Sequence, residues 1–203
     1  MTSGRLVLAS ANPDKAMEIM AIVATLLPGV ELRPRPAALP DVVEDGDTLV
    51  DNARLKATAV AEATGEPALA DDTGLEVTAL DGAPGVYSAR FAGERASYAE
   101  NVAKLLGLLE GGNDRRARFR TVAMVRWPDG REVLAEGVLD GTIATAPRGE
   151  EGFGYDPVFV PDGGGGLTYA EMGPDAKNAL SHRGRALREL AARLTSSGLF
   201  TSP

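Results

Sequence analysis

The stretch ALADDTGLEV, from Ala68 to Val77, places two adjacent carboxylates between two apolar segments. The runs 67–70 and 75–80 have the composition of buried strands, so we expect Asp71 and Asp72 at a strand end, just before a Thr-Gly turn. Two neighbouring carboxylates repel each other, and a bound cation would remove that repulsion. The alternative is an ordinary turn, because Asp is common in turns. The pair therefore indicates either a cation site or a turn.

A hard cation fits this position because carboxylate oxygens are the ligands that Mg²⁺ prefers, and Mg²⁺ also binds phosphate oxygens. The motif Asp72-Thr73-Gly74 is found in aspartic proteases as well. That fold is all-β and uses two such motifs, or a symmetric dimer of short chains. This chain has one motif and at least four predicted helices, so the protease interpretation is rejected.

Length and composition limit the remaining possibilities. The chain has 203 residues, which suits one domain over 1–203, or two tightly merged lobes. A net charge of -8 argues against binding nucleic acid by bulk attraction. The absence of cysteine excludes disulfides, thiolate metal sites and a cysteine nucleophile. No apolar run approaches the ~20 residues of a membrane span, so we expect a cytoplasmic protein without a membrane partner.

Helices and strands alternate along the sequence. The periodicity of apolar residues predicts a mixed-sheet α/β fold with one long hairpin over 118–143. Two helices have clear boundary signals: Asp47 or Thr48 precedes one helix that ends at Gly65, and Ser97 with Glu100 forms a capping box for another. The remaining expected strands are 5–9, 30–34 and 157–160, and the remaining expected helices are 15–27 and one from about Ser181 to the C-terminal end.

The loop SANPDK, Ser10 to Lys15, follows the first strand and precedes a helix. Backbone N–H groups and the positive helix end would meet there and suit a phosphate. Lysine is rare in this chain, with only Lys15, Lys56, Lys104 and Lys177 among 21 basic residues, and three of the four fall in polar motifs. A compact ammonium suits phosphate oxygens. The alternative is an ordinary capping loop, with the lysine positions due to chance.

Three further motifs carry candidate residues. In EDGDTLVDNARLKA, Thr48, Asn52 and Lys56 form one polar stripe of a helix, and Glu44 lies just before it. The stripe either lines an anion site or is solvated. In GFGYDP, residues 152–157, an aromatic ring could stack on a flat base or anchor the loop in the core. In SHRG, residues 181–184, the only histidine either is structural or donates to a ligand oxygen.

Six motifs in this order form one pattern: SANPDK, EDGDTLVDNARLKA, ADDTGLEV, LDGAPGVYSARFAG, GFGYDPVF and SHRGRAL. Together they closely resemble the non-canonical purine NTP pyrophosphatases, the inosine triphosphatase family. The resemblance extends from Leu6 to about Leu194. Each motif alone is weak, whereas six in order at compatible spacing are highly specific. The resemblance implies an elongated two-lobed fold with a deep central cleft, a homodimer, and Mg²⁺-dependent hydrolysis of ITP, dITP and XTP to the monophosphate and pyrophosphate.

The resemblance also implies roles for individual residues. Asp72 would bind the metal and act as the base, Glu44 would be a second metal ligand, and Thr73 would contact substrate. Asp71, pointing the other way, would fix the turn by hydrogen bonds. The triphosphate would be bound by Ser10, Ala11, Asn12, Pro13, Asp14, Lys15 and Lys56. The base would be bound by Phe153, Gly154, Tyr155, Asp156, Lys177, His182 and Arg183.

The sequence departs from the family's motifs at two places, and two other functions remain as alternatives. Val43 stands where some relatives carry a second carboxylate, and Ala11, Pro13 and Asp14 differ from the usual loop. A Maf-type pyrophosphatase, which acts on pyrimidine or modified nucleotides, also begins with LAS and a polar loop, but it is expected to carry paired arginines after that loop. A nucleotide sensor without catalysis would use the same residues for binding alone, although a pure binder gains little from the metal-site carboxylates.

Overall fold

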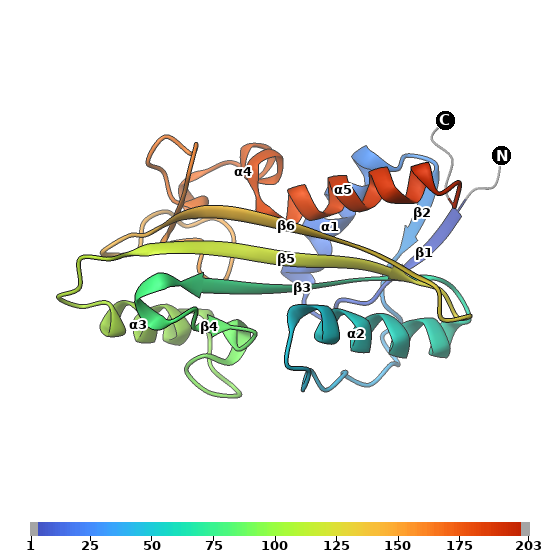
Figure 1. The fold of residues 1–203 in the computed structure, drawn as a ribbon, viewed down its shortest axis with the longest axis horizontal. Coiled ribbons are helices and arrows are strands. Elements are labelled where there is room, and N and C mark those ends of the chain that lie inside the picture. Colours follow the sequence, from blue (N-terminus) through green and yellow to red (C-terminus); the bar gives the residue numbers. More distant parts are fainter. Residues whose placement is uncertain (1–3, 200–203) are drawn as a thin grey trace. The chain divides into compact units, whose positions relative to one another are not determined.

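The computed structural model describes residues 4–199. Its strands form a sheet in the order β2-β1-β3-β5-β6-β7, with β4 paired to β3 (Figure 1). The strands are β1 (Gly4–Leu8), β2 (Val30–Arg33), β3 (Ala68–Val77), β4 (Pro84–Gly85), β5 (Arg116–Arg126), β6 (Glu132–Ile143) and β7 (Phe159–Pro161). The α-helices are α1 (Pro13–Leu26), α2 (Leu49–Thr64), α3 (Tyr98–Leu108), α4 (Pro174–Leu180) and α5 (His182–Ser196).

The sheet is mixed, as the sequence predicts. Strand β1 pairs in parallel with both β2 and β3, while β4 and β7 run antiparallel to their neighbours β3 and β6. The chain divides into two compact units, which are described one at a time. Unit 1 holds the residues up to Asp72, Thr121–Gly137 and those from Arg183 onward; unit 2 holds Thr73–Arg120 and Val138–His182. That residues 1–203 act as a single domain stays a prediction.

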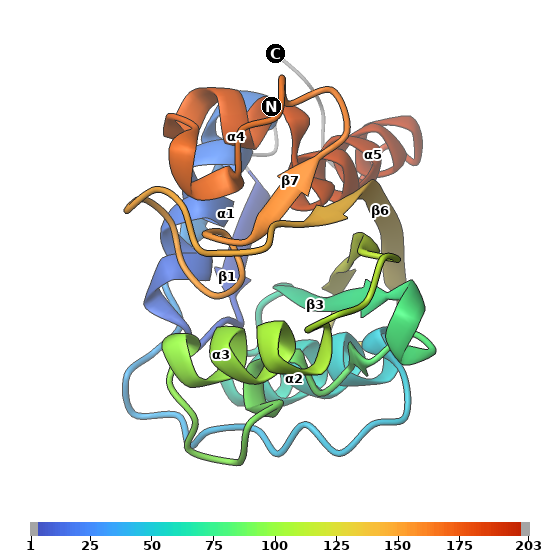
Figure 2. The same ribbon diagram turned by 90° about the vertical axis from the view of Figure 1, so that its left-hand side faces the viewer.

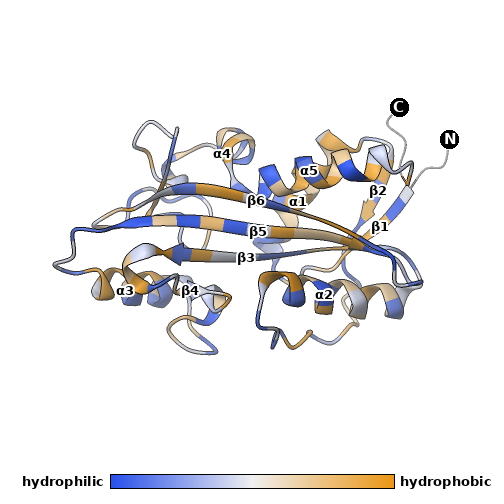
Figure 3. Cartoon of the chain, in the orientation of Figure 1, coloured by the Kyte–Doolittle hydropathy of each residue, from blue (hydrophilic) through white to orange (hydrophobic). Residues whose placement is uncertain are grey.

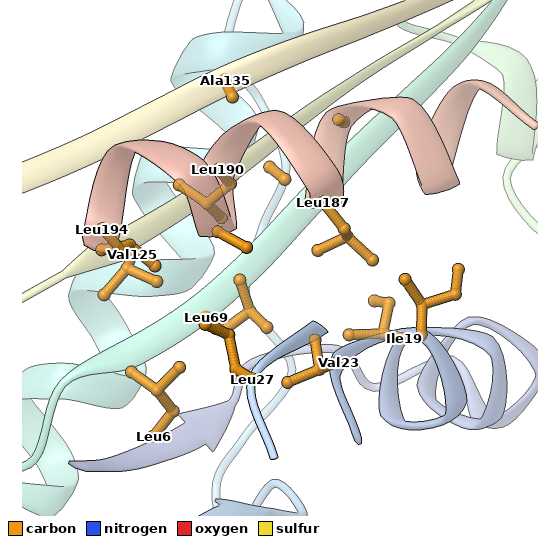
Figure 4. Close-up of a cluster of buried hydrophobic side chains, with 14 of the residues drawn as sticks. Leu6, Ile19, Val23, Leu27, Leu69, Val125, Ala135, Leu187, Leu190 and Leu194 are labelled. Carbon is orange, nitrogen blue, oxygen red and sulfur yellow. The ribbon is translucent and has the colours of Figure 1, made fainter. Parts of the chain in front are cut away.

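The core of unit 1 forms on the face of β1 to which Leu6 and Leu8 point. Apolar side chains of α1 and α5 meet there, among them Ile19 and Leu190 (Figure 4). Figure 3 shows the apolar and polar bands that alternate along α5, as expected for a helix with one buried face. Val7, between the two leucines, is also buried but points to the opposite face, where α2 packs. Helices therefore cover both faces of the sheet in unit 1 (Figure 1).

Local signals in the sequence place both ends of α2. The Thr48 side chain accepts a hydrogen bond from the Asp51 N–H and caps the first turn. Gly65 ends the helix with φ of 68°, a left-handed conformation that glycine adopts without a steric penalty. The predicted cap pair is confirmed, with Thr48 rather than Asp47 as the first cap.

The core of unit 2 contains a group of packed aromatic rings. The Phe119 ring packs edge-on against Phe159, with centroids 4.7 Å apart, and Tyr169 lies 5.2 Å from Phe159. Figure 2 shows β7, which carries Phe159, running beside the end of β6. Helix α3 begins at the predicted capping box, in which the Ser97 and Glu100 side chains each accept the other's backbone N–H. Apolar residues of α3, including Leu105, complete this core.

Two sequence predictions about elements are wrong. Asp71 and Asp72 do not end a strand, because β3 continues through them without a turn. Gly74 looks like a turn signal, but it serves close packing: a Cβ there would lie 2.7 Å from the Gly85 carbonyl oxygen of β4. The helical stretch before Ser181 also differs from the prediction, because short helix α4 precedes the expected helix start. None of the helices between residues 4 and 199 has the length and apolarity needed to cross a bilayer.

Candidate active site

The alternation of β3 separates the two neighbouring carboxylates. Successive side chains of a strand point to opposite faces, so Asp71 and Asp72 point away from each other. Asp71 binds a cation of α5, and Asp72 binds a cation of α2. The expectation that Asp71 points the other way is therefore confirmed. The expectation that it fixes a turn is wrong, because no turn exists there.

The first group of charged residues, here called the Lys56 cluster, consists of Glu44, Lys56 and Asp72. The Lys56 Nζ donates to Glu44 Oε2 and to Asp72 Oδ1, at 2.8 Å each. Lys56 and Asp72 are buried, whereas Glu44 remains partly accessible. One buried ammonium thus holds two carboxylates, one from a loop and one from the middle of a strand.

Burial and charge shift the pKa values of this cluster in different directions. Burial raises the pKa of Asp72, and although Lys56 and Lys15 oppose that effect, the pKa lies above its usual value. Burial also acts to raise the pKa of Glu44, but Lys56 and Lys15 outweigh it, so this pKa is lowered. Burial acts to lower the pKa of Lys56, but Asp72 and Glu44 raise it, so that the ammonium keeps its charge. Asp72 is therefore the more basic carboxylate of the two.

The donor set of the Lys56 cluster fits Mg²⁺. Both candidate ligands, Glu44 and Asp72, present hard carboxylate oxygens, and together they carry one negative charge more than the Lys56 ammonium offsets. Within residues 4–199, no group of three or more His, Cys, Asp or Glu side chains is placed to hold a metal. A metal held by two carboxylates would complete its shell with waters and phosphate oxygens, which is the usual habit of Mg²⁺.

The loop Ser10 to Lys15 begins α1 but offers fewer free donors than the sequence suggests. Asn12 is the N-cap, and its Oδ1 accepts from the N–H groups of Asp14 at 2.9 Å and Lys15 at 3.1 Å. These two N–H groups are therefore already paired, and phosphate binding by the loop stays a prediction. The Lys15 ammonium makes no ion pair within the described part of the chain, yet it lies near enough to Asp71 to lower that pKa. Lys15 is therefore the cation of this loop that remains available for an anion.

The second group, here called the Arg183 cluster, consists of Glu18, Asp71 and Arg183 and lies on the other face of β3. Arg183, at 2% exposed, donates from Nε to Asp71 at 3.2 Å and from Nη1 to Glu18 at 2.5 Å. Burial acts to raise the pKa of Asp71, but Lys15 and Arg183 hold it well below its usual range. These contacts join α1, β3 and α5 within unit 1.

The third group, here called the Lys177 cluster, lies in unit 2 and consists of Phe153, Asp156, Tyr169 and Lys177. The buried Lys177 Nζ donates to Asp156 Oδ2 at 2.6 Å and lies 4.9 Å from the centre of the Phe153 ring. The same carboxylate oxygen accepts from the Phe153 N–H at 2.8 Å. A Cβ at Gly152 would lie 2.2 Å from Asp156, so glycine is required there.

Several predicted base-binding residues serve the core of unit 2. Tyr155 is buried, and its hydroxyl donates a hydrogen bond to the Ser88 carbonyl oxygen at 2.9 Å, so this residue anchors its loop. Phe153 is only half-buried. His182 is buried and stacks on Phe119, with centroids 4.5 Å apart. Gly154 has φ of 64° and no neighbour within 4 Å of a Cβ. Of the two candidate stacking rings, only Phe153 is accessible enough for a base.

Besides Tyr169, three residues in or beside these groups are not among the predicted site residues. Glu18 binds Arg183, and Tyr98 packs against Phe153 with centroids 5.9 Å apart. Asn52, noted only as part of a polar stripe, accepts a hydrogen bond from the Gly46 N–H beside the Lys56 cluster. Helical spacing gave a signal for Asn52, which is one turn from Lys56. No local pattern indicates the other two, because their partners are distant in sequence.

The chain is similar to known proteins over nearly its whole length. The chain is 50% identical over 201 residues to a dITP/XTP pyrophosphatase of Aromatoleum aromaticum, covering 97% of this chain and 100% of that protein. A dITP/XTP pyrophosphatase of Rhodospirillum centenum is 47% identical, with 93% of each chain covered. The solved structure of a HAM1 protein from Coxiella burnetii superposes with a TM-score of 0.85 at 42% identity, covering 95% of this chain and 99% of that one. The Ham1 family model matches residues 6–193, so the chain belongs to the Ham1 family.

Proposed function

We propose that the protein is a nucleoside-triphosphate pyrophosphatase that hydrolyses ITP, dITP and XTP to the monophosphate and pyrophosphate with Mg²⁺. The observation that carries the proposal is the Lys56 cluster, in which one buried ammonium holds Glu44 and Asp72. The two relatives described above bear the name dITP/XTP pyrophosphatase and share about half of their residues with this chain. The motif pattern of the sequence supports the same activity.

In the proposed reaction, Asp72 accepts a proton from the attacking water, whose oxygen forms a bond to the α-phosphorus. The bond between that phosphorus and the α–β bridging oxygen breaks, and pyrophosphate leaves. The raised pKa of Asp72 makes its carboxylate a stronger proton acceptor than an exposed aspartate. Lys15 and Lys56 bind the phosphate oxygens as cations. Glu44 and Asp72 would hold Mg²⁺, which would supply positive charge against the phosphates and a lower pKa for a bound water.

The residues proposed to bind the base are Phe153, Gly154, Tyr155, Asp156, Lys177, His182 and Arg183. Phe153 would stack on any purine. Lys177 and Arg183 carry only hydrogen-bond donors, which satisfy the 6-oxo group of hypoxanthine or xanthine and oppose the 6-amino group of adenine. Thr73 and the loop from Ser10 to Lys15 would complete the contacts with substrate. That the protein acts as a cytoplasmic homodimer also remains part of the proposal, and light scattering of the purified protein would test the dimer.

One assay distinguishes this function from its rivals. The purified protein is incubated with ITP, dITP, XTP, dTTP and ATP, with Mg²⁺ or with a chelator in its place. We expect monophosphate and pyrophosphate from the first three with Mg²⁺, and none with chelator. Preferred turnover of dTTP would instead indicate a Maf-type enzyme. Binding of ITP without any turnover would indicate a nucleotide sensor, and either result would contradict the proposal.

A further inference from the structure

The loop that carries Glu44 has no regular secondary structure of its own. Residues 34–48 connect β2 to α2 without forming a helix or a strand. Contacts between this loop and α2 therefore help to set the position of the Glu44 carboxylate relative to Asp72. Lys56 supplies one such contact, at 2.8 Å from Glu44.

Asn52 supplies a second contact, one helical turn before Lys56. Its Oδ1 accepts a hydrogen bond from the Gly46 N–H at 2.9 Å, which fixes the orientation of the amide because a backbone N–H can only donate. The loop backbone lies directly against α2 at this point. A Cβ at Gly46 would lie 2.8 Å from Asn52 Oδ1 and 2.7 Å from the Asp51 Cβ. Helix α2 thus holds the loop at residue 44 through Lys56 and at residue 46 through Asn52.

The other half of the Asn52 amide shows that packing alone does not account for this residue. Asn52 is 1% exposed, and its Nδ2 has no hydrogen-bond partner among residues 4–199. A buried amide donor without an acceptor is destabilising, and such a group in a native structure requires an explanation. Its neighbours Ala53 and Ala57 are buried and apolar, so an apolar side chain would avoid that cost.

We propose that Asn52 is a positioning residue that holds the Glu44 loop in the geometry needed for metal capture by Glu44 and Asp72. The hydrogen bond to Gly46 fixes the loop two residues after Glu44, so that the carboxylate stays beside Asp72 rather than moving with a loose loop. The Nδ2, which has no partner among residues 4–199, is the cost of this hydrogen bond, because the amide that supplies Oδ1 also carries Nδ2. This inference rests on the metal role in the proposed function.

The test compares metal binding, which a merely structural residue would not change. Mn²⁺ affinity of the nucleotide-free protein is measured by electron paramagnetic resonance for the parent and for Asn52→Leu. Loss of a residue that orients a metal ligand typically weakens metal affinity by about 10–100-fold, and we expect a loss in that range. Exchange of the Gly46 amide proton, followed by NMR, should become faster in the same variant.

Asn101→Leu is the matched control. Asn101 is equally buried on α3 of unit 2, where its Oδ1 accepts from Ala92 at 2.7 Å and its Nδ2 donates to Ala89 at 3.0 Å. Its replacement should lower Tm but leave Mn²⁺ affinity unchanged.

Gly46→Ala disturbs the same contact from the loop side, and it serves as the test if Asn52→Leu fails to fold. Two changes that act through one contact should be non-additive in a double-mutant cycle. Parent-like Mn²⁺ affinity in both single variants would overturn the inference while leaving the proposed function intact. Absence of Mn²⁺ binding by the parent protein would overturn both the metal role and the inference.

Discussion

The carboxylates of Asp71 and Asp72 are adjacent in sequence and lie on opposite faces of β3. Arg183 binds the first at 3.2 Å, and Lys56 binds the second at 2.8 Å. Each carboxylate has its own cation, so their mutual repulsion is offset without a turn. The arrangement assigns structural support to Asp71 and catalysis to Asp72. Replacing Asp71 should therefore lower stability, whereas replacing Asp72 should lower turnover.

Asp72→Asn should abolish turnover of ITP without unfolding the protein. The amide is nearly isosteric but cannot accept the proton of the attacking water, and general base catalysis alone contributes about 10² to 10⁴ in rate. Steady-state kinetics and circular dichroism of the purified variant check both halves of the prediction. Turnover within about threefold of the parent would show that Asp72 is not the base.

Asp71→Asn should reduce stability, and the loss should depend on pH. The folded pKa of Asp71 lies below its unfolded value of about 3.9, so the unfolded chain takes up the proton first. The stabilisation is therefore complete above the unfolded pKa and is lost as pH falls toward the folded pKa. Urea unfolding of parent and variant should show a gap of about 3 kcal/mol near neutral pH, because one partner of a buried ion pair is lost.

That stability gap should narrow when the same comparison is made near pH 3, if acid leaves both proteins folded in the absence of urea. Asp129→Asn provides the control, since Asp129 pairs with Arg131 on the exposed hairpin turn and its loss should have little effect at either pH. A gap for Asp71→Asn that stays constant or widens in acid would contradict the ion-pair account.

Arg183→Ala separates support of the fold from recognition of the base. Removal of a guanidinium from two buried carboxylates should lower Tm. If Arg183 also donates to the 6-oxo group, the ratio of kcat/KM for ITP to that for ATP should fall by roughly tenfold or more, because one unpaired buried donor costs about 1–3 kcal/mol. Glu18→Gln keeps Arg183 and should lower Tm without changing the ratio. An unchanged ratio in Arg183→Ala would place base recognition elsewhere.

Phe153→Ala should lower the kcat/KM of all purine triphosphates to a similar degree. Stacking on an aromatic ring is worth about 1–3 kcal/mol per base and does not depend on the groups at C6. The values of kcat/KM for ITP, XTP and ATP should therefore fall together. A fall in kcat/KM for ITP alone would show that Phe153 orients the base rather than merely stacking on it.

Local signals in the sequence predict the ends of helices well. The Thr48 and Gly65 caps and the Ser97–Glu100 capping box depend on residues within one turn of each other, and all of them are present. The β5–β6 hairpin also follows from its alternation and its Pro-Asp-Gly turn. Motif resemblance, rather than any local rule, led to the family.

Contacts between distant residues could not be predicted in this way. Gly74 indicates a turn by composition, but the close approach of Gly85 keeps β3 continuous there. The partner of Asp71 is Arg183, more than 100 residues away, and the sequence gives no local signal of that pairing. For the same reason the roles of Glu18 and Tyr98 were not foreseen.

The central claim is that water attacks the α-phosphorus, and oxygen-18 labelling tests it most directly. ITP is hydrolysed with Mg²⁺ in oxygen-18 water, and the products are separated and analysed by mass spectrometry. Attack at the α-phosphorus predicts one labelled oxygen in the monophosphate and unlabelled pyrophosphate. Label in pyrophosphate, or release of diphosphate and orthophosphate as the first products, would contradict the account.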